Sequence, residues 1–211
     1  MKVELFVNNP WQENTYLLYD ETKEAVLIDC GCYRDNEIEK IFNYISDNGL
    51  KLVKLLNTHL HIDHIFGIRY IKEEYGFSTC ASKLDEYLLA EAPRYSEVLG
   101  LQKISEPPAI EEYINDGDII KFGNSELKAI STPGHSPGGM CYYNKESAVL
   151  FSGDTLFEGS IGRTDLPGGS REQLLNGIKT KLLTLPGKVK VYTGHGPDTT
   201  IEYEKFNNPF L

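Results

Sequence analysis

The chain has 211 residues, a length that favours one compact domain, so we expect residues 1–211 to fold as a single unit. Its 31 acidic and 21 basic residues give a net charge of −10, which argues against nucleic-acid binding because phosphate backbones are repelled. Hydrophobic residues make up 40% of the chain, enough for a sizeable core. No apolar run approaches the roughly 20 residues that a membrane span needs, so we expect no membrane partner.

The cysteine pattern predicts reduced thiols in a cytoplasmic protein. No CxxC motif occurs, and the first two of the four cysteines are too close for a relaxed disulfide. The four are Cys30, Cys32, Cys80 and Cys141. The N-terminal stretch MKVELFVNNPWQ contains no long apolar segment, so we expect no secretory signal.

The first third of the chain is typical of strands. Residues 3–7, 14–20 and 24–29 are rich in Val, Leu, Ile, Tyr and Phe, with turn residues between them. A helix is predicted next, because its apolar residues recur at i, i+3, i+4 and i+7, with Asp35 as the N-terminal cap and Gly49 as the stop. That apolar face consists of Ile38, Ile41, Phe42 and Ile45.

A short buried strand at 52–56 then leads directly into Thr58-His59-Leu60-His61-Ile62-Asp63-His64, and a helix is predicted over about 65–74. Residues 82–115 give the weakest pattern. Leu84, Leu88 and Leu89 indicate one helix, whereas Pro93 and Pro107-Pro108 interrupt it. We therefore expect 82–115 to be an excursion over the surface.

The second half repeats the strand pattern. Ser170 and Gln173 form a capping box for a helix that runs to about Leu183. Strands are predicted at 118–122, 126–131, 140–143, 148–152 and 189–192, and a short helix near 200–206. The alternation favours an α/β fold with helices covering stacked sheets.

Histidines are concentrated where strands end. The chain has only five, and His59, His61 and His64 fall within six residues, beside Asp63, after a buried strand. Imidazole and carboxylate are good ligands for zinc, iron or manganese, and a turn at a strand end can bring such side chains to one point. A histidine-rich loop without a metal is the alternative, and the composition argues against it.

The other candidates also follow strand-like runs. His135 lies in a Pro-Gly-His-Ser-Pro-Gly-Gly stretch and His195 in a Thr-Gly-His-Gly-Pro stretch, whose glycines and prolines favour tight turns. Asp154 follows the buried run 148–151. An isolated aspartate there would more often cap a turn. A carboxylate can also bridge two cations, which need an anion between them to offset their repulsion.

The motif Thr58 to His64, followed by His135, Asp154 and His195, resembles the metallo-β-lactamase superfamily over essentially the whole chain. The resemblance implies a four-layer αββα sandwich with two divalent metal ions, foremost zinc with iron or manganese as alternatives, at one sheet edge. It also implies a division of the ligands. One metal is held by His59, His61 and His135, the other by Asp63, His64 and His195, with Asp154 bridging them.

Within that superfamily the sequence is similar to the short glyoxalase II–like (hydroxyacylglutathione hydrolase-like) branch. Larger members carry a helical C-terminal domain, which we expect to be absent because the chain ends soon after His195. In the stretch from Gly159 to Asp165, Arg163 stands where the larger enzymes place a lysine near the thiol peptide. Its guanidinium can bind a substrate carboxylate as a fork. Equally, an Arg163–Asp165 pair can merely order the loop.

The function that this resemblance implies is hydrolysis of a small acyl thioester such as S-lactoylglutathione. Two metals would lower the pKa of a shared water, and Asp63 would hold the resulting hydroxide and accept its proton.

A persulfide dioxygenase with one iron on His59, His135 and Asp154 is the main alternative. A β-lactamase is disfavoured because those enzymes generally lack an aspartate at position 154. A non-catalytic metal-binding protein is disfavoured by the intact ligand set. The thiol carrier, the cellular metal, protein partners and the oligomeric state stay open.

Overall fold

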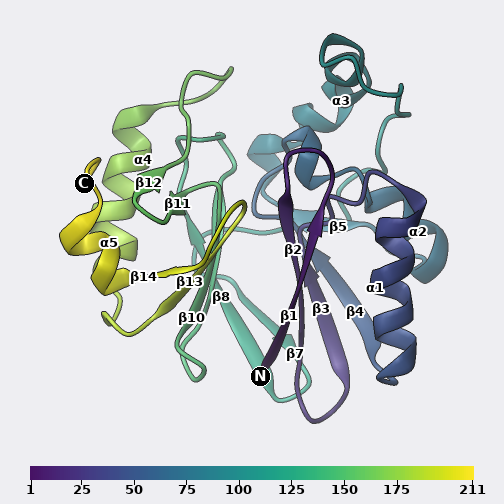
Figure 1. Cartoon of the computed structure of the whole chain (residues 1–211), viewed down its shortest axis with the longest axis horizontal. Coiled ribbons are helices and arrows are strands. Elements are labelled where there is room, and N and C mark those ends of the chain that lie inside the picture. The colour runs from purple at the N-terminus through teal and green to yellow at the C-terminus, as the bar shows by residue number, and fades with distance from the viewer.

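The computed structural model describes residues 1–211. Two six-stranded sheets pack face to face, and helices cover both outer faces (Figure 1). Helices α1 (Asp35–Asp47) and α2 (Ile68–Tyr75) lie on the first sheet, and α4 (Arg171–Gly177) and α5 (Ile201–Asn207) lie on the second. These four layers confirm the αββα sandwich that the sequence implied.

The first sheet has the order β1-β2-β3-β4-β5-β6. Its first three strands are antiparallel, and the pairs from β3 to β6 are parallel. The strands are β1 (Lys2–Asn8), β2 (Glu13–Tyr19), β3 (Glu24–Ile28), β4 (Lys51–Leu56), β5 (Thr79–Ala81) and β6 (Glu112–Tyr113). The short β5 and β6 were not predicted.

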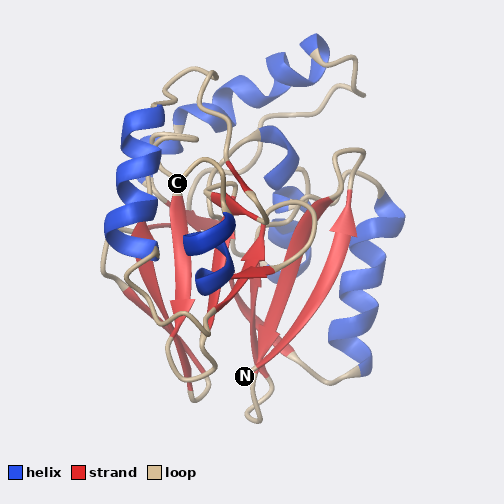
Figure 2. Ribbon diagram, turned by 60° about the vertical axis from the view of Figure 1, so that its left-hand side comes forward, coloured by secondary structure: helices blue, strands red, loops and turns tan.

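The second sheet has the order β14-β13-β10-β9-β8-β7 and contains one parallel pair, β10 with β13. Its strands are β7 (Ile119–Phe122), β8 (Ser125–Ser131), β9 (Met140–Asn144), β10 (Val149–Gly153), β13 (Lys190–Thr193) and β14 (Thr199–Thr200). A separate two-stranded ribbon pairs β11 (Leu156–Phe157) with β12 (Ser160–Ile161). Figure 2 shows loops and short turns gathered around the upper ends of the strands.

Short helical segments connect these strands. They are the 3₁₀ turns η1 (Ile62–His64) and η2 (Lys83–Asp85), helix α3 (Tyr87–Val98), and a π-helical turn η3 (Ile178–Leu182) that continues α4. None of the helices is both long enough and apolar enough to cross a membrane.

Three apolar clusters hold the layers together. Strand β2 supplies two of them because successive side chains point to opposite faces: Leu17 packs under the helices, while Tyr16 and Leu18 pack between the sheets. Phe122, Tyr142 and Phe151 meet them from the second sheet, and burying each such side chain is worth roughly 1.5–3 kcal/mol. Burial on both faces explains why the strands appear in the sequence as continuous apolar runs.

Two local predictions were wrong. Pro93 does not break the helix but lies inside α3, where Leu88, Leu89 and Ala92 are buried in the first apolar cluster. That packing offsets the hydrogen bond that a helical proline loses. The segment 82–115 is therefore partly core rather than only a surface excursion.

Asp35 does not cap α1, because Arg34 occupies the cap position. The carboxylate of Glu37 instead accepts hydrogen bonds from the backbone N–H groups of Tyr33 and Arg34, at 2.8 and 3.1 Å. A glutamate three residues into the helix can reach back in this way to the free N–H groups that precede it.

One buried carboxylate ties the two sheets together at their turns. Asp20, after β2, accepts hydrogen bonds from Asn124 N–H (2.7 Å) and Ser125 Oγ (2.9 Å) in the β7–β8 turn, and from Thr22. Gly123 is required there, because its φ is +52° and a Cβ would lie 2.2 Å from Thr22 Oγ1. Burial alone would raise the pKa of Asp20, but these hydrogen bonds lower it to about 2.

Asp20 is expected to make the fold sensitive to acid. Its pKa is lower in the folded than in the unfolded chain, so its contribution is present above about pH 4 and is lost as the pH falls toward about 2. An Asp20→Asn variant should therefore lose stability near pH 6 and approach the parent protein near pH 2.5. Urea midpoints measured across that range test this, and a constant difference between the two proteins would contradict it.

Candidate metal centre

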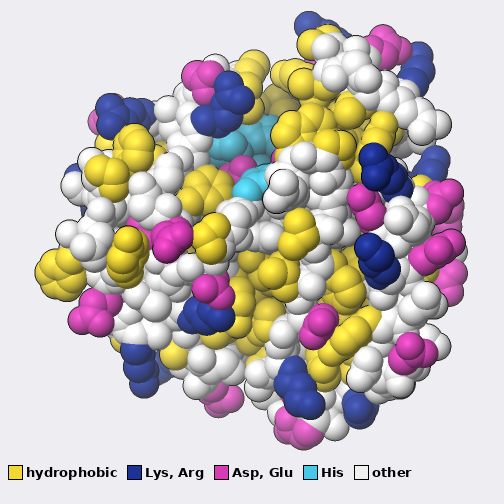
Figure 3. Space-filling model, in the orientation of Figure 1, with side chains coloured by type: hydrophobic (Ala, Val, Ile, Leu, Met, Phe, Trp, Pro, Cys, Tyr) yellow, Lys and Arg dark blue, Asp and Glu magenta, His cyan; other side chains and the backbone are white.

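Four strand ends deliver all seven predicted metal-binding side chains to one place. β4 leads into His59, His61, Asp63 and His64, and β10 ends immediately before Asp154. The loop after β8 carries His135, and the turn after β13 carries His195. Their donor atoms form overlapping groups in which all atoms lie within 4.8 Å of one another. Figure 3 shows histidine surface (cyan) at the bottom of a hollow between hydrophobic side chains.

The first group consists of His59, His61 and His135. His135 Nε2 lies 3.2 Å from His59 Nε2 and 2.9 Å from His61 Nδ1. The outer nitrogens of two of the rings have separate partners, since His135 Nδ1 donates to Arg163 O and His59 Nδ1 faces Thr58 Oγ1. With those protons turned outward, the inner nitrogens present lone pairs toward one point.

The second group consists of Asp63, His64 and His195. His195 Nε2 lies 3.2 Å from Asp63 Oδ2 and 3.3 Å from His64 Nε2. Here too the outer nitrogens are engaged, because His64 Nδ1 donates to Asp29 Oδ2 (3.0 Å) and His195 Nδ1 donates to Trp11 O (2.9 Å). Such outer hydrogen bonds fix the tautomer and the ring orientation of metal-binding histidines.

Asp154 lies between the two groups. One carboxylate oxygen, Oδ1, is 3.4 Å from His64 Nε2, and the other, Oδ2, is 3.5 Å from His135 Nε2. Oδ1 is buried without any hydrogen-bond partner. A Cβ at position 194 would lie 2.1 Å from Oδ1, so only Gly194 leaves it room. Converging lone pairs around an unpartnered carboxylate oxygen fit a pair of divalent cations.

The electrostatics of the cluster also suit cations. Burial, followed by the neighbouring His64 and His135 rings, lowers the pKa of His59, and burial lowers that of His61 to about 4. Burial would lower the pKa of His64 as well, but the carboxylates of Asp29 and Asp154 outweigh it and raise that pKa. Neutral imidazoles, such as those of His59 and His61, bind metals. The carboxylates of Asp29 and Asp154 attract positive charge to the cluster.

Two buried aspartates that sequence reasoning missed hold the cluster in place. Asp29, after β3, accepts hydrogen bonds from Thr58 N–H (2.8 Å) and Thr58 Oγ1 (2.8 Å) besides the one from His64. It follows a buried strand just as Asp154 does, so the same strand-end argument would have found it.

Asp85 joins the two loops that carry the first histidine group. It is fully buried, and it accepts hydrogen bonds from Leu60 N–H (3.2 Å), Ser136 Oγ (2.7 Å) and Gly138 N–H (2.6 Å). Leu60 lies between His59 and His61, and Ser136 follows His135. Asp85 belongs to the segment 82–115, and no pattern in that segment points to an aspartate that holds the cluster.

A cavity of about 500 Å³ opens onto the cluster. Its polar floor includes His61, Asp63 and His195, and its apolar wall comes largely from α3 and the residue after it, namely Leu88, Ala92, Tyr95, Val98 and Leu99. Arg163 also lines the cavity, where its guanidinium forms a two-point ion pair with Asp165 at 2.8 and 2.7 Å. The loop-ordering pair expected as one alternative is therefore present. Arg163 faces the same cavity as the histidine and aspartate cluster, which is called the metal cluster below, and that cavity is called the metal cavity.

Comparison with known proteins identifies relatives of similar length. The hydroxyacylglutathione hydrolase GloC of Haemophilus influenzae is 35% identical, over 100% of this chain and 98% of that protein. The solved structure of BLEG-1, described as a B3 metallo-beta-lactamase, is 36% identical with a TM-score of 0.90, over 100% of this chain and 99% of that one. TTHA1623, solved in a di-iron-bound form, is 37% identical with a TM-score of 0.86, over 96% and 97%.

The two-sheet sandwich with histidines and aspartates gathered at one edge, together with relatives named as hydrolases, places the chain among the metallo-hydrolases. The sequence profile of the metallo-beta-lactamase superfamily matches residues 8–195, and the chain belongs to that superfamily. Its members bind divalent metals, and the di-iron form of TTHA1623 means that zinc does not follow from the fold.

Proposed function

We propose that this protein hydrolyses acyl thioesters of small thiols, with S-lactoylglutathione as the reference substrate, at a dinuclear metal centre. The position of Asp154 is the observation that carries the proposal, because its carboxylate lies against both groups of nitrogen donors. Oδ1 is 3.4 Å from His64 Nε2, and Oδ2 is 3.5 Å from His135 Nε2 and 3.7 Å from His195 Nε2. The 35% identity to a hydroxyacylglutathione hydrolase over the full length supports the substrate class.

The proposed ligand sets are those implied by the resemblance to the metallo-β-lactamase superfamily: His59, His61 and His135 for one cation, Asp63, His64 and His195 for the other, and Asp154 for both. Zinc is the proposed metal and iron the alternative. When bound, two such cations supply a water of lowered pKa and polarise the carbonyl of the substrate.

Asp63 has a second proposed role as a proton acceptor. Burial would raise its pKa, but His64 and a hydrogen bond from His195 outweigh burial and lower that pKa. Asp63 therefore stays ionised at neutral pH on the floor of the cavity, where it can orient an attacking water and take up its proton. Arg163 is proposed to contact the substrate through the part of its guanidinium that Asp165 leaves free.

β-Lactam hydrolysis is a second candidate. It is favoured by the 36% identity and the TM-score of 0.90 to BLEG-1. The apolar wall beside the polar floor of the cavity suits a β-lactam as well as an acyl thioester.

Metal content and turnover measured on one preparation test the proposal. We expect about two zinc or iron ions per chain, hydrolysis of S-lactoylglutathione, and loss of both after treatment with a chelator, since ligand sets of this kind hold their metals reversibly. If the protein hydrolyses nitrocefin but does not hydrolyse S-lactoylglutathione, β-lactam hydrolysis is favoured. One iron per chain, with oxygen uptake on a persulfide and no thioester hydrolysis, would overturn the proposal in favour of the dioxygenase alternative.

A further inference from the structure

A second cavity, of about 510 Å³, lies outside the metal cluster. It is formed by the residues that precede α1, the start of α2 and the segment that follows α3. Three cations line it, Arg34, Arg69 and Lys103, together with the aromatic rings of Tyr33, Phe66 and Tyr70. Its size is that of a pocket for a small-molecule ligand or a large part of one.

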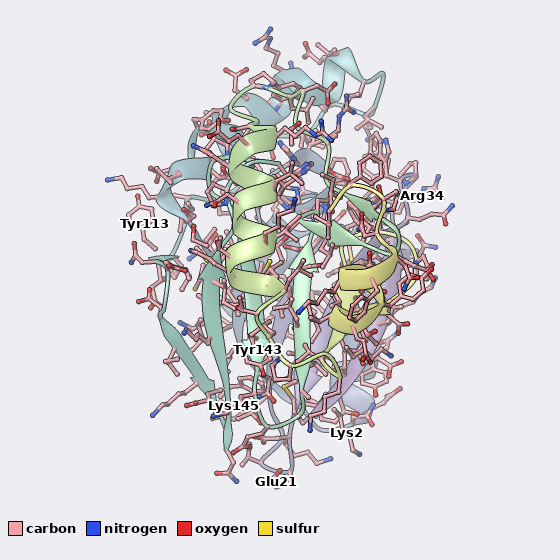
Figure 4. All side chains as sticks on the ribbon, turned by 90° about the vertical axis from the view of Figure 1, so that its left-hand side faces the viewer. Lys2, Glu21, Arg34, Tyr113, Tyr143 and Lys145 are labelled. Carbon is pink, nitrogen blue, oxygen red and sulfur yellow. The ribbon has the colours of Figure 1, made fainter.

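This concentration of positive charge is unusual in a chain whose net charge is −10. The cavity has one carboxylate, Asp35, which accepts a hydrogen bond from Tyr70 Oη (2.6 Å). Arg34 forms no ion pair, and Figure 4 shows it projecting outward from the surface. The other two cations form only exposed ion pairs, Arg69 with Glu73 at 3.6 Å and Lys103 with Glu97 at 2.8 Å. Exposed pairs of this kind are weak, so a bound anion can replace them.

The second cavity adjoins the metal cavity. Trp11 lines the metal cavity, Phe66 lines the second, and their rings are stacked with centroids 6.2 Å apart. Phe66 also contacts Tyr33, whose Oη accepts a hydrogen bond from Gln102 N–H (2.8 Å). The chain that leaves α3 likewise passes from one cavity to the other, because Leu99 lines the first and Gln102 lines the second.

The metal cavity itself has little positive charge to offer an anionic substrate. Arg163 is the only lysine or arginine that lines it, and two of its nitrogens already bind Asp165. Small thiols that carry acyl groups commonly bear several negative charges. An anionic carrier whose thioester lies at the metals would find three further cations beyond the Trp11–Phe66 pair, in the second cavity.

We propose that the second cavity is a subsite for the anionic end of the thiol carrier, an inference that rests on the proposed thioester function. This subsite would bind an oxyanion through Arg34, Arg69 and Lys103. Carboxylates of a peptide thiol and phosphates of a nucleotide thiol share this chemistry. Only the nucleotide also brings a planar ring for Tyr33, Phe66 and Tyr70 to stack against.

Substrate selectivity tests the subsite. The Arg34→Gln/Arg69→Gln double variant is compared with the parent protein on three lactoyl thioesters: those of glutathione, of coenzyme A and of the neutral thiol N-acetylcysteamine. We expect kcat/KM for the preferred charged thioester, relative to the neutral one, to fall about tenfold, mostly through KM, because two charge-assisted contacts are lost. The charged thioester whose kcat/KM, relative to that of the neutral thioester, falls more in the double variant identifies the thiol carrier. Arg94→Gln, an exposed α3 arginine that lines neither cavity, is the matched control.

A binding measurement separates the subsite from the activity. Trp11 is the only tryptophan, and it stacks on Phe66 at the border of the cavity, so its fluorescence reports occupancy. S-methylglutathione or coenzyme A should change its emission saturably, and about tenfold more weakly in the double variant. This result supports the subsite even in a preparation that hydrolyses no thioester, in which case the proposed function alone fails. An unchanged selectivity ratio together with unchanged binding would overturn the subsite, even if thioester hydrolysis is observed.

Discussion

An Asp154→Asn variant is expected to bind one metal ion or fewer per chain, against two in the parent protein. Only this carboxylate has oxygens that face both donor groups, at 3.4 Å from His64 Nε2 and 3.5 Å from His135 Nε2. An amide lacks the negative charge that offsets the repulsion between two cations. We expect kcat/KM to fall about 100- to 1,000-fold, the range for the loss of one group that stabilises charge during the reaction. Elemental analysis and S-lactoylglutathione turnover measure both effects.

The control for this variant is Asp116→Asn, which makes the same change at an exposed carboxylate paired with Lys181. It should keep its full metal content and activity. Circular dichroism on both variants establishes that the fold is intact. Full metal content with full activity in the Asp154→Asn protein would contradict the bridging role.

An Asp85→Ala variant is expected to lower both stability and activity. Truncation leaves three buried donors, on Leu60, Ser136 and Gly138, without the acceptor that they share. Burial raises the pKa of Asp85 and so offsets part of the benefit of these bonds. We nevertheless expect the free energy of unfolding to fall by about 3 kcal/mol, since each unpaired buried donor costs roughly 1–3 kcal/mol. Urea unfolding at a fixed metal concentration measures this.

The activity of the Asp85→Ala protein should fall as well, because the loops that carry His59, His61 and His135 lose their common anchor. Its neighbour Glu86 provides the control, since Glu86 accepts a hydrogen bond only from the exposed Tyr113. Glu86→Gln should differ from the parent protein by less than about 0.5 kcal/mol, as is usual for surface substitutions. A similarly small effect of Asp85→Ala would mean that the two loops hold their positions without it.

The sequence predicted the long elements and the candidate cluster well for one physical reason. Strands buried on both faces leave continuous apolar runs, so β2, β3 and β4 were placed to within a residue or so. The side chains after such runs gather at one sheet edge, and the structure brings all seven candidates together there. Their assignment as metal ligands, like the expectation of one domain, stays a prediction.

Other features were invisible because they depend on tertiary contacts. Strands β5 and β6 have three and two residues, too few for an alternating pattern. The helix through Pro93 forms because its buried face packs on the first sheet, which local propensity does not report. Asp85 acts through groups 25 to 53 residues away along the chain, so only the folded chain reveals its partners.

The division of the candidate metal ligands between the two sheets would link metal uptake to the folding equilibrium. One set of donors follows β4 in the N-terminal half, and the rest follow β8, β10 and β13 in the C-terminal half. A cation shared between His59 and His135, or between His64 and His195, would therefore act as a non-covalent cross-link that exists only when the two halves have docked. Its free energy of binding adds to that of folding by mass action, roughly 2.7 kcal/mol when free metal is at 100 times its dissociation constant. The melting temperature of this protein should consequently rise with metal concentration, and a cell that starves it of metal would lose folded protein as well as activity.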